Sequence, residues 1–214
     1  MSPDPFDPLD ASGFERAVGE LVHRDLDLAG VLDRFGPPPF WTREPGFPTL
    51  VLFILEQQVS LASARAAYDR LLQEVDVLEP EALLALDDAT LRVAGFSRQK
   101  TGYGRDLARA VSSGTLDLEG LARRPDAEVR SALMAVRGIG RWTADVYLLS
   151  CLRRPDVWPV GDLALARAVG EVKGVETGPG TAELEAVAEP WRPWRAAAAR
   201  ILWHDYLSRR GRSS

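Results

Sequence analysis

Two glycines spaced one residue apart, Gly138 and Gly140, constrain the fold of this 214-residue chain more than any other feature. Apolar helical patterns run over 126–135 before them and over about 142–152 after them, so the connection between the two helices is very short. Glycine tolerates a left-handed backbone or the close approach of another group, which such a connection requires. The first N–H groups of the second helix lack partners within the helix and carry the positive end of its dipole. The stretch therefore predicts a helical hairpin whose tip either binds phosphate through its backbone or is an ordinary connection.

The rest of the chain also predicts helices, and no alternating strand pattern of useful length occurs. Residues 1–12 are rich in Pro and Asp and are expected to be loose, and the proline-rich segment 36–48 is expected to be irregular. The apolar run 49–55 is expected in the core, and Ser60 or Ser63 is expected to cap the helix after it. The helices are predicted at 14–21, 26–35, after the serine cap to 72, at 80–85, 88–94, 98–111, 117–122 and from Pro193 onward. We therefore predict an all-α fold.

Composition excludes several classes of site. A single cysteine, Cys151, rules out an internal disulfide, and one Cys with two His is too few for a zinc site or an iron–sulfur cluster.

No apolar run is long enough for a membrane span and the N-terminus does not read as a signal peptide, so we expect no membrane partner and a cytoplasmic location. The net charge of −5 argues against a nucleic-acid partner only if the charge is evenly spread. It is not, because residues 191–214 hold six arginines and a single acidic residue, Asp205.

Several stretches together resemble the helix-hairpin-helix (HhH-GPD) DNA glycosylases, in particular the alkylpurine or 3-methyladenine type II branch. The stretches are RGIGRWTAD, VWPVGDLALARAV, ILEQQVS (54–60), AGFSRQKTGY (94–103) and WRPWRAAAARILWHDYL (191–207). The resemblance covers about residues 25–210. It implies two helical lobes around a cleft that binds DNA and the damaged base, one from about 13–60 plus 176–214 and the other from about 61–175.

Asp162 is the candidate catalytic residue. It precedes an apolar helical pattern, and aspartate is among the best residues for an N-cap, so a purely structural role is the alternative. Cleavage of an N-glycosidic bond builds positive charge on the sugar, and a carboxylate held ionised by a helix N-terminus stabilises that charge and orients water. In the family, the aspartate that matches Asp162 does this work. Asp156 is the competing carboxylate, but its surroundings read as a polar turn.

The resemblance also assigns residues to the base and to the opened duplex. The residue that matches Gln58 is a wedge that fills the gap left by an extruded nucleotide, although a pair of glutamines in a turn can also be simply solvated. The residues that match Trp142 and Trp203 line the base pocket, where indole faces suit a purine made cationic by alkylation. A position that is aromatic in some relatives is Val146 here, with Tyr147 beside it as a further pocket candidate.

The expected DNA contacts are Gly138, Gly140, Arg141, Thr143, Gln58 and Lys100, although Arg141 and Lys100 could equally be solvated surface charges. By resemblance only, the hairpin also holds a monovalent cation, Na⁺ or K⁺, through the backbone carbonyls of Met134, Val136 and Ile139. No other cofactor is expected, and no iron–sulfur cluster.

We thus predict a monomeric, monofunctional glycosylase that acts on damaged purines in double-stranded DNA by base flipping and leaves an abasic site. Lyase relatives carry a lysine where this chain has Trp142, and the only lysines here are Lys100 and Lys173, so no strand cleavage is expected. The alternatives are a non-catalytic hairpin protein that binds DNA and a glycosylase for a neutral damaged base such as hypoxanthine.

Overall fold

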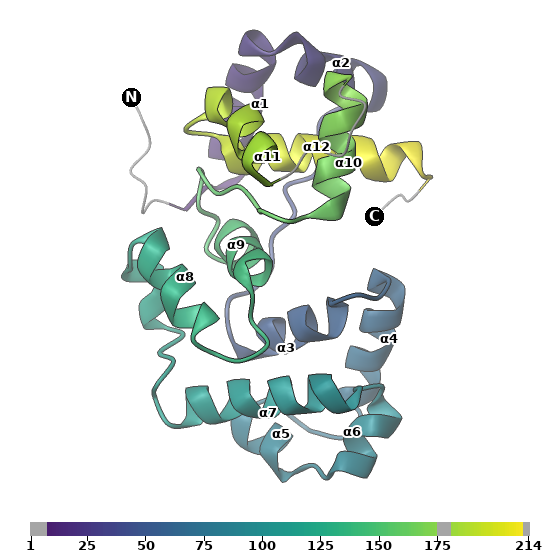
Figure 1. Cartoon of the computed structure of the whole chain (residues 1–214), viewed down its shortest axis with the longest axis vertical. Helices are drawn as coiled ribbons and strands as arrows, with labels where there is room; N and C mark the ends of the chain where they lie inside the picture. Colours follow the sequence, from purple (N-terminus) through teal and green to yellow (C-terminus); the bar gives the residue numbers. More distant parts are fainter. Residues whose placement is uncertain (1–7, 175–180, 212–214) are drawn as a thin grey trace. The chain divides into compact units, whose positions relative to one another are not determined.

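The computed structural model describes residues 8–174 and 181–211, and every regular element in these ranges is helical, which confirms the all-α prediction. The chain divides into two compact units. We call residues 1–42 and 148–214 the terminal unit and residues 43–147 the central unit (Figure 1). None of the helices in the described ranges combines the length and the apolar character needed to cross a membrane.

The terminal unit is built from helices at both ends of the chain. They are α1 (Ala11–Arg24), α2 (Leu26–Phe35), α10 (Leu163–Lys173), α11 (Thr181–Ala188) and α12 (Arg195–Arg209), with a 3₁₀ turn η2 at Glu189–Trp191. Helix α12 lies at the centre and packs against α1, α2 and α10 (Figure 1). Four consecutive buried alanines, 196–199, leave little side chain between α12 and its neighbours, so the helices can approach closely.

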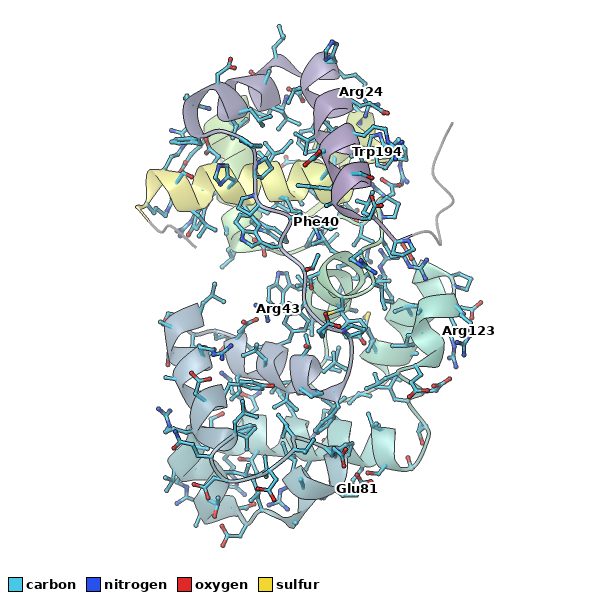
Figure 2. All side chains as sticks on the ribbon, turned by 180° about the vertical axis from the view of Figure 1, so that it is seen from behind. Arg24, Phe40, Arg43, Glu81, Arg123 and Trp194 are labelled. Atoms are coloured by element: carbon cyan, nitrogen blue, oxygen red, sulfur yellow. The ribbon has the colours of Figure 1, made fainter. Side chains whose placement is uncertain are left out.

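Arg200 is a fully buried cation in the middle of α12. Its Nη2 donates to the carbonyl oxygens of Trp41 (3.1 Å) and Leu149 (2.9 Å), and its Nη1 donates to that of Ala196. The guanidinium also lies 5.2 Å from the centre of the Phe40 ring, which Figure 2 labels. Burial lowers the pKa of Arg200 to about 9, so the group is charged at neutral pH. One side chain therefore holds together helix α12 and two segments far away in sequence.

The central unit is contiguous in sequence. It contains α3 (Phe47–Glu56), α4 (Leu61–Leu71), α5 (Pro80–Ala85), α6 (Asp88–Ala94), α7 (Arg98–Ser112), a 3₁₀ turn η1 (Gly120–Arg123) and α8 (Asp126–Met134), and α9 (Arg141–Ser150) begins in it. The apolar run of α3 is core, as predicted, and packs against α4 and α7. Arg43, labelled in Figure 2, pairs with Glu56 at 2.7 Å and covers the Phe53 ring, which ties the entry of the unit to the end of α3.

Several predicted boundaries need correction. Helix α3 begins at Phe47, inside the segment 36–48 predicted to be irregular, because Pro48 suits the first turn of a helix. The helix predicted at 117–122 is the 3₁₀ turn η1 at Gly120–Arg123. Residues 11 and 12 are helical rather than loose, because Asp10 caps α1 by accepting from the N–H of Gly13, and Leu9 is buried and donates its N–H to Arg153. The expectation for residues 1–7 lies outside the described residues. The last helix begins at Arg195 and not at Pro193, since Trp194 is its N-cap with non-helical backbone angles (φ −112°, ψ 26°).

The division into units also differs from the predicted lobes. Helix α3 belongs with the middle of the chain because it packs against α4 and α7, and α10 belongs with the ends because it packs against α12 and α2. The junctions accordingly fall at 42/43 and at 147/148, within α9, rather than near 60 and 175.

Candidate functional site

The predicted hairpin is present in the central unit, between α8 and α9. It closes with a hydrogen bond from the N–H of Ile139 to the carbonyl of Val136 at 3.1 Å. Gly138 has φ +95°, and a Cβ built there would lie 2.2 Å from the Tyr103 ring. A Cβ built on Gly140 would meet nothing within 4 Å. Gly138 is therefore required by the fold itself, whereas Gly140 faces open space and is the glycine at which an incoming phosphate would be obstructed by a side chain.

The two polar residues at the start of α9 differ in exposure. The side chain of Arg141 is 48% exposed and its Nε donates to Asp145 at 2.7 Å. Asp145 is completely buried and also accepts from Nε of Arg130 at 2.5 Å. Thr143 is buried, so a contact from it to DNA would have to come from its backbone. Sequence reasoning missed Asp145, for which the only signal was an arginine four residues earlier.

The turn between α3 and α4 separates its two glutamines. Gln58 is exposed and has φ +59°, a left-handed conformation that is uncommon for residues other than glycine. Gln57 is half-buried, and its Nε2 donates to the carbonyl of Gly138 at 2.8 Å. Of the pair, Gln58 is thus the exposed residue, and its role as a wedge stays a prediction.

Lys100 is half-buried, and its ammonium group is bound to a backbone carbonyl. Its Nζ donates to the carbonyl of Leu55 in the last turn of α3, at 2.7 Å. Partial burial lowers the pKa of the Lys100 ammonium. The structure therefore gives Lys100 a definite role in holding α3, and its contact with phosphate stays a prediction.

Two of the aromatic pocket candidates lie in α9. Trp142 is half-buried, whereas Tyr147 is fully buried and its hydroxyl accepts a hydrogen bond from the N–H of Gly46 at 3.1 Å. Because Gly46 is the N-cap of α3, Tyr147 fixes the start of that helix. Val146, between them in the helix, is half-buried.

The other two site candidates, Asp162 and Trp203, meet within the terminal unit. Asp162 is the N-cap of α10, and its Oδ1 accepts from the N–H of Leu165 at 2.7 Å. The same oxygen lies 3.3 Å from Nε1 of Trp203, which comes from α12 and is half-buried. The N-cap prediction is confirmed, and the structure adds an indole N–H donor from 41 residues further along the chain.

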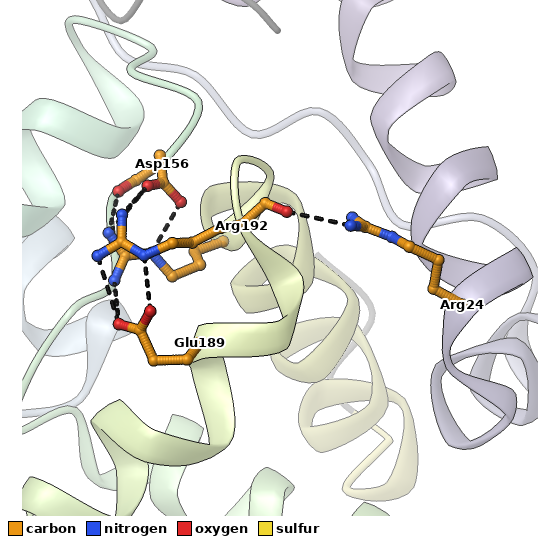
Figure 3. A network of polar contacts seen from close by, with 5 residues as sticks. Arg24, Asp156, Glu189 and Arg192 are labelled. Carbon is orange, nitrogen blue, oxygen red and sulfur yellow. Dashed lines mark hydrogen bonds and ion pairs between the residues drawn. The ribbon is translucent and has the colours of Figure 1, made fainter.

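The competing carboxylate, Asp156, is engaged in a separate network (Figure 3). Arg192 and Arg195 both bind it, Arg195 through Nε at 2.7 Å, and Glu189 pairs with Arg192 at 2.8 Å. Arg24 joins from α1 by donating to the carbonyl of Arg192. The network fixes the segment that precedes Asp162 onto the start of α12 and occupies Asp156 in ion pairs.

The three backbone carbonyls expected to hold a cation, those of Met134, Val136 and Ile139, fit such a group chemically. Met134 ends α8 and Val136 follows it, where the helix dipole is negative. The carbonyl of Val136 accepts one internal hydrogen bond, from Ile139, and a carbonyl oxygen has two lone pairs. Among the residues that the structure describes, no group of three or more acidic, His or Cys side chains could hold a metal ion.

The chain is similar in sequence to known repair proteins. It is 30% identical over 186 residues to a putative DNA-3-methyladenine glycosylase of Bacillus subtilis, an alignment that covers 83% of this chain and 65% of that protein. The chain thus spans less than two thirds of that relative's length.

Solved structures agree with this similarity. A DNA-3-methyladenine glycosidase from Bacillus halodurans matches with a TM-score of 0.76 and 33% identity, and the match covers 91% of both chains. A 3-methyladenine DNA glycosylase of Schizosaccharomyces pombe, solved in complex with abasic DNA, matches with a TM-score of 0.79 and 26% identity over 88% of this chain and 95% of that one.

The family model that describes the HhH-GPD superfamily base excision DNA repair proteins matches residues 51–193, a range that includes the hairpin, both glutamines and Asp162. The chain therefore belongs to the HhH-GPD superfamily of base excision DNA repair proteins.

Proposed function

We propose that this protein is a DNA glycosylase that hydrolyses the N-glycosidic bond of alkylated purines, of the 3-methyladenine type, in duplex DNA. The observation that carries the proposal is the pairing of Asp162 with Trp203 at the N-terminus of α10. The substrate class is supported by the names of the relatives, which are 3-methyladenine glycosylases.

Asp162 supplies the charge that the reaction needs. As the bond between base and sugar breaks, the sugar approaches an oxocarbenium ion, and a nearby carboxylate stabilises the developing positive charge. The same carboxylate orients the water that attacks C1′ and accepts its proton. The backbone N–H of Leu165 and the indole N–H of Trp203 both donate to Oδ1 of Asp162. These two hydrogen bonds fix the rotation of the carboxylate before the substrate binds.

The central unit would bind and open the duplex. Phosphate would bind at the backbone beside Gly140, where no side chain intervenes, and the exposed Gln58 would enter the stack as the target nucleotide leaves. The half-buried indole of Trp203, beside Asp162 in the terminal unit, would face the extruded purine. In the central unit, Trp142 stays a base-pocket candidate by resemblance. A monovalent cation on the carbonyls of Met134, Val136 and Ile139 would add positive charge beside the phosphate site.

Strand cleavage is not part of the proposed reaction, because it needs an amine nucleophile that forms a Schiff base with the sugar. Nζ of Lys173 is paired with Asp25 at 2.6 Å and with Asp27 at 2.9 Å, and its pKa is raised because these partners outweigh the effect of burial. Nζ of Lys100 donates to Leu55. Both amines are thus engaged by partners within their own units, which supports a hydrolytic reaction.

Base release from defined duplexes tests the proposal. We expect release from duplexes that contain 3-methyladenine or 7-methylguanine, and no covalent complex with DNA when borohydride is present during turnover. Release of hypoxanthine alone would instead indicate a neutral substrate. Binding without release from any of these duplexes would indicate a non-catalytic protein, and a borohydride-trapped complex would contradict the hydrolytic mechanism.

A further inference from the structure

The turn between α3 and α4 is fastened to the hairpin by one side-chain hydrogen bond. Gln57 is the C-cap of α3, and its Nε2 donates to the carbonyl of Gly138 at 2.8 Å across 81 residues of sequence. Both residues lie in the central unit. The bond therefore joins the segment that carries Gln58 to the turn that precedes Gly140.

The Gly138 end of this bond is a fixed point. The Tyr103 ring occupies the space that a side chain at 138 would need, and the Tyr103 hydroxyl accepts from Gln99 at 2.7 Å. The guanidinium of Arg137 lies 5.8 Å from the centre of the same ring, and its Nε donates to Asp106 at 2.6 Å. Tyr103 and Asp106 of helix α7 thus pack against the hairpin turn. The carbonyl of Gly138 cannot move without disturbing that packing.

The Gln58 end is held in an unusual conformation. A left-handed backbone at a residue other than glycine persists only when the surroundings determine it. On the N-terminal side of Gln58, two side-chain contacts fix the chain, namely Lys100 on the carbonyl of Leu55 and Gln57 on the carbonyl of Gly138. The Lys100 contact holds helix α3. The Gln57 contact is made by the residue adjacent to Gln58, so it directly restrains the backbone conformation of Gln58.

We propose that Gln57 is a positioning residue that couples phosphate binding at the hairpin to insertion of Gln58, an inference that rests on the proposed glycosylase function. When the hairpin seats on the backbone of the duplex, the Gln57–Gly138 bond fixes where Gln58 meets the base stack. Without the bond, the hairpin still binds phosphates, but Gln58 is no longer held in the left-handed conformation from which it fills the gap. The loss then falls on extrusion of the base and not on affinity for the duplex.

Gln57→Met is the informative variant, because methionine keeps the length and approximate volume of the side chain and removes the donor. A single neutral hydrogen bond corresponds to an effect of about five- to tenfold. We expect single-turnover release from a paired lesion to fall by about this factor, while the dissociation constant for undamaged duplex stays within about twofold. Gln57→Glu places a carboxylate, which cannot donate a hydrogen bond, next to the carbonyl of Gly138. We therefore expect its rate of base release to fall further than that of Gln57→Met. Gln73→Leu, at an exposed glutamine of the same unit, is the matched control.

The decisive comparison uses a lesion placed opposite an abasic site, where extrusion requires less energy. The Gln57→Met defect should shrink to within about twofold there. An equal loss on paired and unpaired lesions, a loss of affinity for undamaged duplex, or a rate equal to that of the wild type would overturn the proposal. Thermal unfolding of each variant shows whether it has a folding defect. If Gln57→Met has one, Gln57→Asn, which is shorter but keeps the amide, takes its place.

A readout without turnover separates this proposal from the proposed function. In the Asp162→Asn background, the fluorescence of a 2-aminopurine next to the lesion reports extrusion directly. If the wild type releases no base but Gln57→Met still weakens the fluorescence change at constant duplex affinity, the glycosylase assignment fails and the coupling stands. If release is efficient and Gln57→Met alters neither signal, the coupling fails and the glycosylase assignment stands.

Discussion

Replacing Asp162 by Asn separates the two roles of this residue, the helix cap and the catalytic charge. The Oδ1 atom of the carboxylate accepts hydrogen bonds from the N–H of Leu165 and from the indole N–H of Trp203. An amide oxygen can accept both, and Asn caps helices about as well as Asp. Asn also loses the interaction of the charge with the dipole of α10, which contributes about 0.3–1 kcal/mol. We expect Asp162→Asn to unfold within a few degrees of the wild type.

The catalytic effect should be much larger. A preorganised group that stabilises transition-state charge contributes about 10²–10³ in rate, or about 2.7–4 kcal/mol. Single-turnover base release by Asp162→Asn should therefore fall at least about 100-fold, with duplex affinity unchanged or tighter because the charge matters only in the transition state.

Asp162→Ala provides the second comparison, since it also removes the cap and should cost about 1 kcal/mol or more in stability. If the charge is what matters, the Asn and Ala variants lose similar activity despite different stabilities. Asp87→Asn, the same change at the N-cap of α6, is the control for general effects of a neutralised cap. Release by Asp162→Asn within a few-fold of the wild type would refute the catalytic assignment, and activities that follow stability would show that the cap is the role that matters.

Three further predictions concern the hairpin, its buried carboxylate and acid stability. Gly140→Val should weaken binding to damaged and undamaged duplex alike without loss of fold, whereas Gly138→Val should lower the melting temperature because of its φ of +95° and the ring behind it; equal duplex affinity of Gly140→Val and the wild type would exclude phosphate binding there. Asp145→Asn should lower the free energy of urea unfolding by about 2 kcal/mol, because the guanidiniums of Arg130 and Arg141 lose their buried carboxylate partner. A decrease below about 0.5 kcal/mol would contradict this prediction. Burial raises the pKa of Asp25, but the hydrogen bonds from Lys173, Trp191 and the N–H of Leu28 together with the charge of Lys173 outweigh it, so the net pKa lies below 3.8. The ionised carboxylate therefore stabilises the fold above that pH, and this stabilisation is lost as the pH falls through the lower value, so Lys173→Met should flatten the loss of stability in acid.

The sequence predicted best those features that depend on neighbouring residues. The helices at 26–35, 80–85 and 88–94 have the predicted bounds, because Pro, Gly and Asp at their ends determine where helices begin and end. The N-cap role of Asp162 was predictable for the same reason.

Features that depend on remote contacts were not predictable in this way. No local pattern brings Trp203 to Asp162 or Gln57 to Gly138, and the two junctions between the units follow from which helices pack together. The phosphate, wedge and base-pocket roles rest on the family resemblance and stay predictions.

The buried guanidinium of Arg200 has a consequence for the order in which the chain folds during synthesis. The carbonyl oxygens of Trp41 and Leu149 accept from the same nitrogen, at 3.1 and 2.9 Å, so they are at most 6.0 Å apart. The central unit thus enters and leaves at one place, as a domain inserted into another does. Because the central unit is contiguous in sequence, all of its residues are available for packing once residue 147 has left the ribosome. Helices α1 and α2, although made first, cannot complete their packing until the chain has reached α12 at its far end.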